Sequence, residues 1–139
     1  MDRPDALTVR DLDELQQWWR FVVGPWGFER RQLFVVLVAV DGTVMPSLMN
    51  VVDLPRRPDD ESLDGLAEVL TGLAERVGAL DGSVAALWAR PGVRGPSSDD
   101  VVWLSALHRV LSALPMRAWP VYYANDDGPR PAVPDELVA

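Results

Sequence analysis

The sequence predicts an α/β fold in which a mixed sheet of about five strands carries three helices on its faces. Short apolar runs rich in β-branched residues alternate along the chain with segments whose apolar residues recur at helical spacing. A hairpin signal precedes this alternation, and a hairpin followed by β–α–β–α–β spacing favours a mixed sheet covered by helices. The length of 139 residues predicts one domain over 1–139, with an N-terminal helix at 9–23, a core at 33–123 and a short C-terminal tail.

The first predicted element is the helix over 9–23. Thr8, followed three residues later by Asp11, resembles a capping box and predicts the helix start. The apolar positions that follow recur at helical spacing: Leu12, Leu15, Trp19 and Val22. Gly24-Pro25 ends this helix, because glycine suits the position after the last turn and proline cannot continue the helix.

A hairpin comes next. Residues 33–40 form an apolar, mostly β-branched run, which is typical of a strand buried on both faces. Asp41-Gly42 follows and favours a tight turn, because both central positions of such a turn need positive φ. Residues 44–52 would then return as the second strand. Pro46 lacks a backbone donor, so this strand is expected at a sheet edge or with a bulge.

The second helix and third strand follow a polar loop. Ser62 can cap the helix, and Gly78 ends it. Its apolar stripe consists of Leu63, Leu66, Leu70, Leu73 and Val77. Residues 83–88 then predict the third strand, after an Asp81-Gly82 turn.

A Gly/Pro-rich loop over 90–96 leads to the third helix, which Ser97 or Ser98 caps and Pro115 stops. The buried stripe of this helix is Leu104, Leu107, Leu111 and Leu114. Residues 118–123 predict a fourth strand and 130–133 a short edge strand, and the chain from Pro134 is expected to form the tail.

The composition excludes several kinds of catalytic centre. The chain has no cysteine and a single histidine, His108, so it can build neither a thiol nucleophile nor a histidine-rich metal site. All 13 basic residues are arginine, which excludes Schiff-base lysine chemistry. His108 and the nearby Ser105 have no evident third partner for a triad. We therefore predict no catalytic residue, no metal and no cofactor.

The charge and hydropathy limit the partners and the location. The net charge of −8 disfavours binding to phosphate backbones, so we expect no nucleic acid partner. No segment reaches the roughly 18 apolar residues of a membrane helix, so we expect no membrane association. The acidic start over 1–5 is unlike a signal peptide, which predicts a cytoplasmic protein.

The most informative window runs from Trp88 to Asp100, where a strand passes through the Gly/Pro loop into a helix. It carries Pro96-Ser97 with Asp100 three residues after Ser97, and a loop proline at Pro91. This pattern resembles the metal-site loop of the JAMM/MPN family, especially its RadC-like branch. That family has a His-x-His-Pro element at the strand end and Pro-Ser-x-x-Asp at the helix start, and the resemblance covers roughly 33–123.

The resemblance implies a member that has lost its metal. In the family the two histidines and the Asp hold zinc, and a Glu from an earlier strand activates the bound water. Here Trp88 and Arg90 stand at the histidine positions, the loop is one residue shorter, and 33–52 contains no Glu. Asp100 alone cannot hold zinc, which needs about three protein ligands. The resemblance thus implies a metal-free pseudoenzyme with JAMM-like, cytidine-deaminase-like layering.

The same window supports two other interpretations. Ser97 and the acids that follow it are also typical of an ordinary helix start. Alternatively, the loop could hold an anionic small molecule, because helix N-termini and arginines favour anions. The residues of this candidate binding loop are Trp88, Arg90, Arg94, Ser97 and Asp100.

Aromatic residues are dense near the N-terminus, and arginines lie beside them. These residue types dominate protein interfaces, which predicts a contact patch for a homodimer or a protein partner. Its candidate residues are Trp18, Trp26, Phe28, Arg30 and Arg31. The alternative is that the aromatic side chains simply cover the edge of the sheet.

The sequence therefore favours a non-catalytic protein-binding or scaffold module. The alternative is a small enzyme or binding protein for an anionic small molecule, using the loop from Arg90 to Ser97. A third interpretation is a structural partner whose acidic surface recognises a basic protein.

Overall fold

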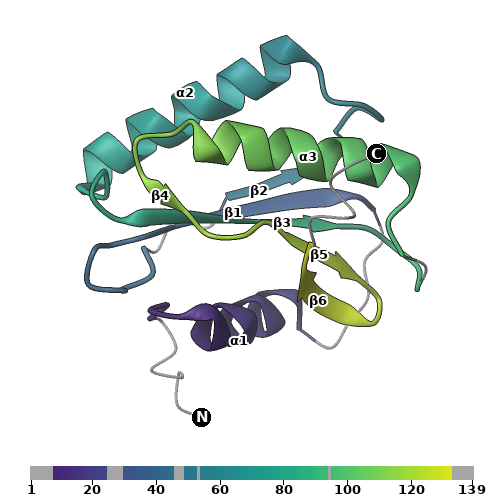
Figure 1. Cartoon of the computed structure of the whole chain (residues 1–139), viewed down its shortest axis with the longest axis horizontal. Helices are drawn as coiled ribbons and strands as arrows, with labels where there is room; N and C mark the ends of the chain where they lie inside the picture. The colour runs from purple at the N-terminus through teal and green to yellow at the C-terminus, as the bar shows by residue number, and fades with distance from the viewer. Residues whose placement is uncertain (1–7, 25–29, 46–48, 53, 94, 133–139) are drawn as a thin grey trace.

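The computed structural model describes residues 8–24, 30–45, 49–52, 54–93 and 95–132. The chain has the predicted α/β class, with a mixed six-stranded sheet and three helices (Figure 1). Its elements, in order, are α1 (Leu12–Val23), β1 (Gln32–Val38), β2 (Met49–Val52), α2 (Asp60–Val77), β3 (Ser83–Ala89), α3 (Ser98–Ser112), β4 (Arg117–Ala118), β5 (Tyr122–Asn125) and β6 (Gly128–Pro131). No helix among the described residues is both long enough and apolar enough to span a bilayer.

The sheet runs in the order β2-β1-β3-β5-β6, with the short β4 beside β3. β1 is antiparallel to both β2 and β3, whereas β3 is parallel to β4 and β5. β6 returns antiparallel to β5. The parallel pairing of β3 with β5 requires a crossover, and α3 supplies it. β2 and β6 are therefore the two edges of the sheet.

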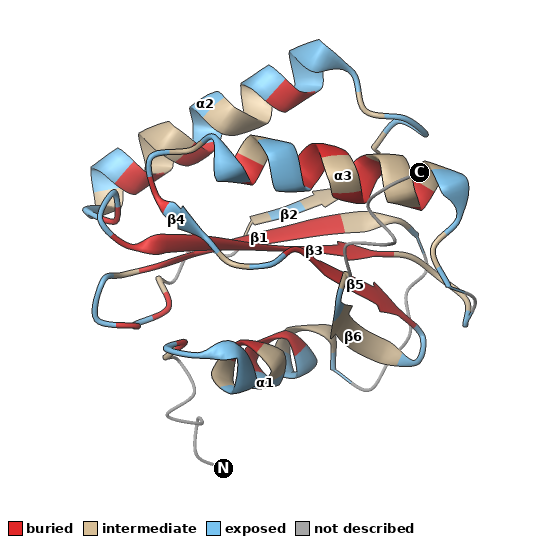
Figure 2. Ribbon diagram, in the orientation of Figure 1, coloured by how far each residue is buried: buried red, intermediate tan, exposed pale blue. Residues whose placement is uncertain are grey.

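The helices divide between the two faces of the sheet. α2 and α3 cover one face and α1 covers the other (Figure 1). Along β1, Leu33, Val35 and Leu37 belong to the core beneath α2 and α3, while the alternate residues belong to the core beneath α1. Both faces of β1 and β3 are thus buried (Figure 2), which confirms the expectation from the uniformly apolar run.

The hairpin forms where Asp41-Gly42 predicts it, but its turn is longer than the two-residue type, and its second arm is irregular. Gly42 has a φ of +94°, and Val38 pairs with Val44 across the turn. Farther along, Val35 pairs with Met49. Val35 and Val38 are three residues apart, whereas their partners Met49 and Val44 are five residues apart. The returning arm therefore has two extra residues before β2. The described part of the returning strand is β2 at Met49–Val52, which lies at an edge of the described sheet as expected, whereas Pro46 itself lies outside the described residues.

The start of α1 differs from the prediction. Asp11, not Thr8, caps α1, and its carboxylate accepts a hydrogen bond from the Glu14 N–H at 2.8 Å. Thr8 instead pairs with Thr43, and the Val9 N–H donates to the Gly42 carbonyl. The segment before Asp11 is therefore held in extended form against the hairpin turn, which prevents an earlier helix start.

The start of α2 also differs. Asp59 caps this helix and accepts from the Ser62 N–H at 2.7 Å, so Ser62 is the donor and not the cap. Asp60 and Glu61 then occupy the first turn, where acids offset the positive end of the helix. For α3, the capping by Ser97 is confirmed.

The predicted strand over 118–123 is two shorter strands. β4 pairs with the start of β3, and β5 pairs with its end. Pro120 lies between them and cannot donate to a ladder, which explains the break. The predicted edge strand at 130–133 is β6, at Gly128–Pro131. The predicted tail from Pro134 lies outside the described residues.

Candidate functional site

The candidate binding loop joins the end of β3 to the start of α3, and the fold brings four of its five residues together. Trp88 is the second-to-last residue of β3 and is completely buried. Asp100 is the third residue of α3 and is 2% exposed. Arg90 and Ser97 lie at the two ends of the connecting loop. Arg94 lies outside the described residues.

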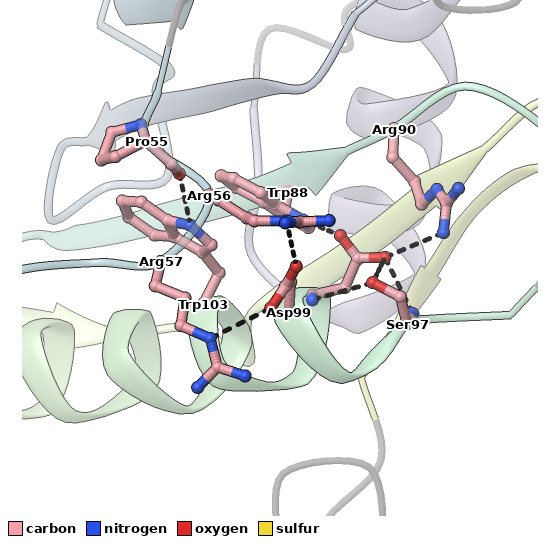
Figure 3. A network of polar contacts seen from close by, with 9 residues as sticks. Pro55, Arg56, Arg57, Trp88, Arg90, Ser97, Asp99 and Trp103 are labelled. Atoms are coloured by element: carbon pink, nitrogen blue, oxygen red, sulfur yellow. Dashed lines mark hydrogen bonds and ion pairs between the residues drawn. The ribbon is translucent and has the colours of Figure 1, made fainter.

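The Asp100 carboxylate is the centre of this group, and Figure 3 labels the residues that donate to it, Trp88, Arg90 and Ser97. Its Oδ1 accepts from Trp88 Nε1 at 2.9 Å, and its Oδ2 accepts from Arg90 Nη1 at 3.1 Å. Oδ2 also accepts from the backbone N–H of Ser97 at 2.9 Å and from its hydroxyl at 3.0 Å. The Asp100 N–H donates back to Ser97 Oγ at 3.2 Å, which completes a capping box.

This arrangement limits the chemistry of the carboxylate. All four contacts come from donors, and one donor is a guanidinium, so both oxygens are already satisfied by groups that would repel a metal cation. Among the described residues, no group of three or more His, Asp or Glu side chains could hold a metal ion. Through these hydrogen bonds, the Asp100 carboxylate connects β3, the loop and α3.

Arg90 is charged and has partial access to solvent, because 27% of its side chain is exposed. Its N–H donates to the Ala124 carbonyl on β5, and its Nε donates to the Pro91 carbonyl at 3.0 Å. Nη1 is used by Asp100. The guanidinium is thus held beside the buried Trp88–Asp100 pair by two of its five N–H donors, those to Pro91 and Asp100.

A second group of contacts ties the loop before α2 to α3. Trp103 stacks on Trp88 with ring centroids 4.9 Å apart and planes 14° apart, and its Nε1 donates to the Pro55 carbonyl at 3.1 Å. Asp99 forms ion pairs with Arg56 at 3.0 Å and with Arg57 at 3.1 Å (Figure 3). The sequence pattern did not single out Trp103, although its position three residues after Asp100 places both on one side of the helix.

Tyr123 of β5 lies beside the Asp100 group. It is completely buried, and the Arg130 guanidinium lies over its ring at 5.2 Å from the centroid. Burial raises the pKa of Tyr123, and the negative charge of Asp100 adds to that effect, while Arg90 and other neighbours oppose it. The phenol therefore stays protonated at neutral pH. Sequence reasoning missed this residue, because only the parallel pairing of β5 with β3 places it there.

The aromatic patch predicted near the N-terminus is only partly described. Trp18 is 6% exposed and belongs to the core between α1 and the sheet, so its placement favours the alternative in which it covers the sheet. Arg30 is exposed and Arg31 is half-buried. Trp26 and Phe28 lie outside the described residues. A contact surface around the two arginines stays a prediction.

The spacing of four residues after Leu104 predicts that the His108 ring is half-buried beside the apolar stripe of α3, and this prediction is wrong. His108 is exposed on α3, and Ser105 is half-buried one turn earlier. The imidazole therefore projects into solvent, away from the apolar stripe of the helix.

An apolar groove that the sequence did not predict lies between β2 and α2. It has a volume of about 410 Å³. Its lining includes Val52, which is 39% exposed, and Val69, which is 52% exposed. The remaining lining residues are Leu33, Met49, Val51, Leu54, Pro55, Ser62, Leu63, Gly65, Leu66 and Trp103. Trp103 connects this groove to the Asp100 group.

The two edges of the sheet differ in how open they are. At β6, the Ala132 N–H donates inward to the Val121 carbonyl, so the alternate residues Pro129 and Pro131 turn their nitrogens outward. These nitrogens carry no hydrogen, and Gln16 of α1 donates to the outward carbonyl of Pro129 at 2.8 Å. At β2, the four residues Met49–Val52 contain no proline, and within the described chain only β1 pairs with them.

Comparison of the chain with protein-family models, with curated proteins and with solved structures finds no match.

Proposed function

We propose that this chain is a non-catalytic protein-binding module whose partner lies along β2 and in the groove beside it. The observation that carries the proposal is an open strand edge bordered by an apolar groove of about 410 Å³. An extended segment can add to such an edge through backbone hydrogen bonds, while its alternate side chains enter a neighbouring pocket.

The contrast between the two edges supports this location. Natural sheets protect exposed edges with prolines or covering elements, and β6 has both. β2 has neither among the described residues. An edge that is left open beside exposed valines at positions 52 and 69 fits a surface that pairs with another chain.

The state of Asp100 supports the non-catalytic part of the proposal. A carboxylate that accepts from Trp88, Arg90 and Ser97 has an evident structural role and needs no bound ion to explain its burial. The same contacts suit a metal-free relative of the JAMM/MPN family, in which Asp100 would stand where a zinc ligand does.

The anion-binding alternative receives less support. An anion at the start of α3 would need the donors of Arg90 and Ser97, and Asp100 already occupies several of them. Asp99 and Asp100 would also repel it. We therefore place this function second.

The proposal is tested by the substitution Val52→Asp, which puts a charge at the end of the open strand β2, where this residue borders the groove. The control is Val40→Asp, the same change at a valine that is 72% exposed and lies in the hairpin turn. A partner co-purified from lysate of the source organism should be retained by the control and lost by Val52→Asp. Adding the purified partner should also slow amide hydrogen exchange in β2. Equal retention by both variants, or unchanged exchange in β2, would contradict the proposal.

A further inference from the structure

Along α2, a stripe of residues lies outside the buried face, and one side of this stripe, at Gly65 and Val69, borders the groove beside β2. The inner face is marked by Leu63, Leu70 and Ala74, which are buried. On the opposite side, residues recur at spacings of three and four, as along the seam between two packed helices. This outer stripe consists of Glu61, Gly65, Glu68, Val69, Gly72 and Arg76.

The outer stripe is self-complementary about its middle, between Glu68 and Val69. Gly65 and Gly72 lie at equal distances along the chain from this middle, and so do Glu61 and Arg76. When two identical helices pack antiparallel about a two-fold axis, each position faces the position equally far from the axis on the other helix. Gly65 would then face Gly72 of a second copy, and Glu61 would face its Arg76.

The charges and the glycines fit such a contact. Glu61 and Arg76 are both exposed, and neither makes an ion pair among the described residues. A Cβ added at Gly65 or Gly72 would meet nothing within 4 Å, so neither glycine is needed for packing inside this chain. Glycine weakens a helix interior relative to alanine, but it lets a second helix approach closely.

We propose that a second copy of this chain docks antiparallel on the outer stripe of α2, through two symmetric Glu61–Arg76 pairs and two Gly65–Gly72 contacts. At the middle of the contact, Val69, which is 52% exposed, would face the exposed Glu68 of the second copy. The net charge of −8 on each copy opposes the approach, but salt screens this repulsion beyond roughly 8 Å while the paired charges stay in contact. The dimer goes beyond the proposed function, because its charges and Gly72 lie outside the groove.

Charge exchange tests the pairing. In sedimentation equilibrium, the wild-type chain is expected to dimerise, and either Glu61→Arg or Arg76→Glu should weaken association by about tenfold or more. The double variant Glu61→Arg/Arg76→Glu restores both pairs in swapped form and should return association to within a few-fold of wild type. Asp127→Arg and Arg109→Glu are the controls, because they reverse exposed charges outside α2.

Gly72→Leu separates the contact from effects on folding. Leucine favours a helix more than glycine, so the folded monomer should melt at a higher temperature. Association should nevertheless weaken, because the side chain keeps the two helices apart. A wild-type chain that stays monomeric, a double variant no better than the single ones, or full association of Gly72→Leu would each overturn the proposal. If Val52→Asp loses the groove partner but still dimerises, that result bears on the proposed function alone and leaves the dimer proposal unaffected.

Discussion

At the scale of single residues, the Asp100 group shows how a helix cap can also join distant elements. Ser97 and Asp100 form a local capping box, which any isolated helix could contain. The fold then adds Trp88 from β3 and Arg90 from the loop to the same carboxylate. A buried carboxylate is stabilised only when its oxygens are satisfied, so this residue contributes to stability through all its donors together.

Removing the carboxylate should therefore be costly. Asp100→Ala leaves the Trp88 N–H and the Ser97 N–H without an acceptor and is expected to lower the free energy of unfolding by about 3 kcal/mol. Urea denaturation measures the change. The control is Asp99→Ala, which removes the more exposed pairs with Arg56 and Arg57 and should cost less than about 1 kcal/mol. Equal losses in the two variants would mean that Asp100 is no more than a surface cap.

At the scale of elements, the helices begin where an acidic or hydroxyl side chain can accept from the first turn. Asp11, Asp59 and Ser97 occupy these positions in α1, α2 and α3. Hydrogen bonds donated by Ser62, chiefly from its backbone N–H, lower the pKa of Asp59 from its ordinary value of 3.8. The charged form of Asp59 is therefore favoured by the folded state.

The sign of the resulting pH dependence follows from the lowered pKa. A carboxylate whose pKa falls on folding contributes stability above its ordinary pKa, and that contribution is lost as the pH falls through the lowered value. Asp59→Ala should thus lower the melting temperature by a few degrees at pH 7. The difference from wild type should shrink below about pH 4.

Thermal melts followed by circular dichroism over this pH range check the effect. The control is Asp60→Ala, which changes an acid of the same turn that receives no capping hydrogen bond among the described residues. A difference between Asp59→Ala and wild type that grows towards low pH would contradict the assignment of the cap.

At the scale of the whole molecule, the described strands form a sheet with one protected edge and one open edge. Pro129, Pro131 and Gln16 block pairing along β6. Among the described strands β2 is left to pair, and α2 lies above the face of the sheet that carries the groove beside β2 (Figure 1). Both proposed contacts therefore adjoin, with Gly65 and Val69 common to the groove and the outer stripe.

The protection of β6 can be removed by Pro129→Thr/Pro131→Thr. Threonine suits strands, and two outward N–H groups would be restored at this edge. We expect the double variant to form larger species than wild type at equal concentration, measured by dynamic light scattering. Pro115→Thr, which makes the same change at an exposed proline outside the sheet, is the control and should associate as wild type does. A double variant as dispersed as wild type would show that the prolines do not protect this edge.

The class of the fold and most of its elements follow from local patterns. The apolar run of β1, the stripe of α3 and the Asp41-Gly42 turn are each decided by neighbours in the chain, so the sequence was enough to predict them. The caps of α1 and α2 were misplaced, because several acids and hydroxyls near each start compete and the extended contacts of the preceding segment select among them.

The sequence by itself determined an α/β chain with a capped third helix, and it excluded thiol and histidine-rich chemistry. Only the tertiary structure decided that Trp88, Asp100 and Trp103 share one buried network, that Tyr123 lies beside it, and that β2 forms the open edge. The reason is physical. Periodicity and capping depend on bonds within a few residues, whereas strand order and register bring together residues far apart in the chain, and no local pattern encodes that order.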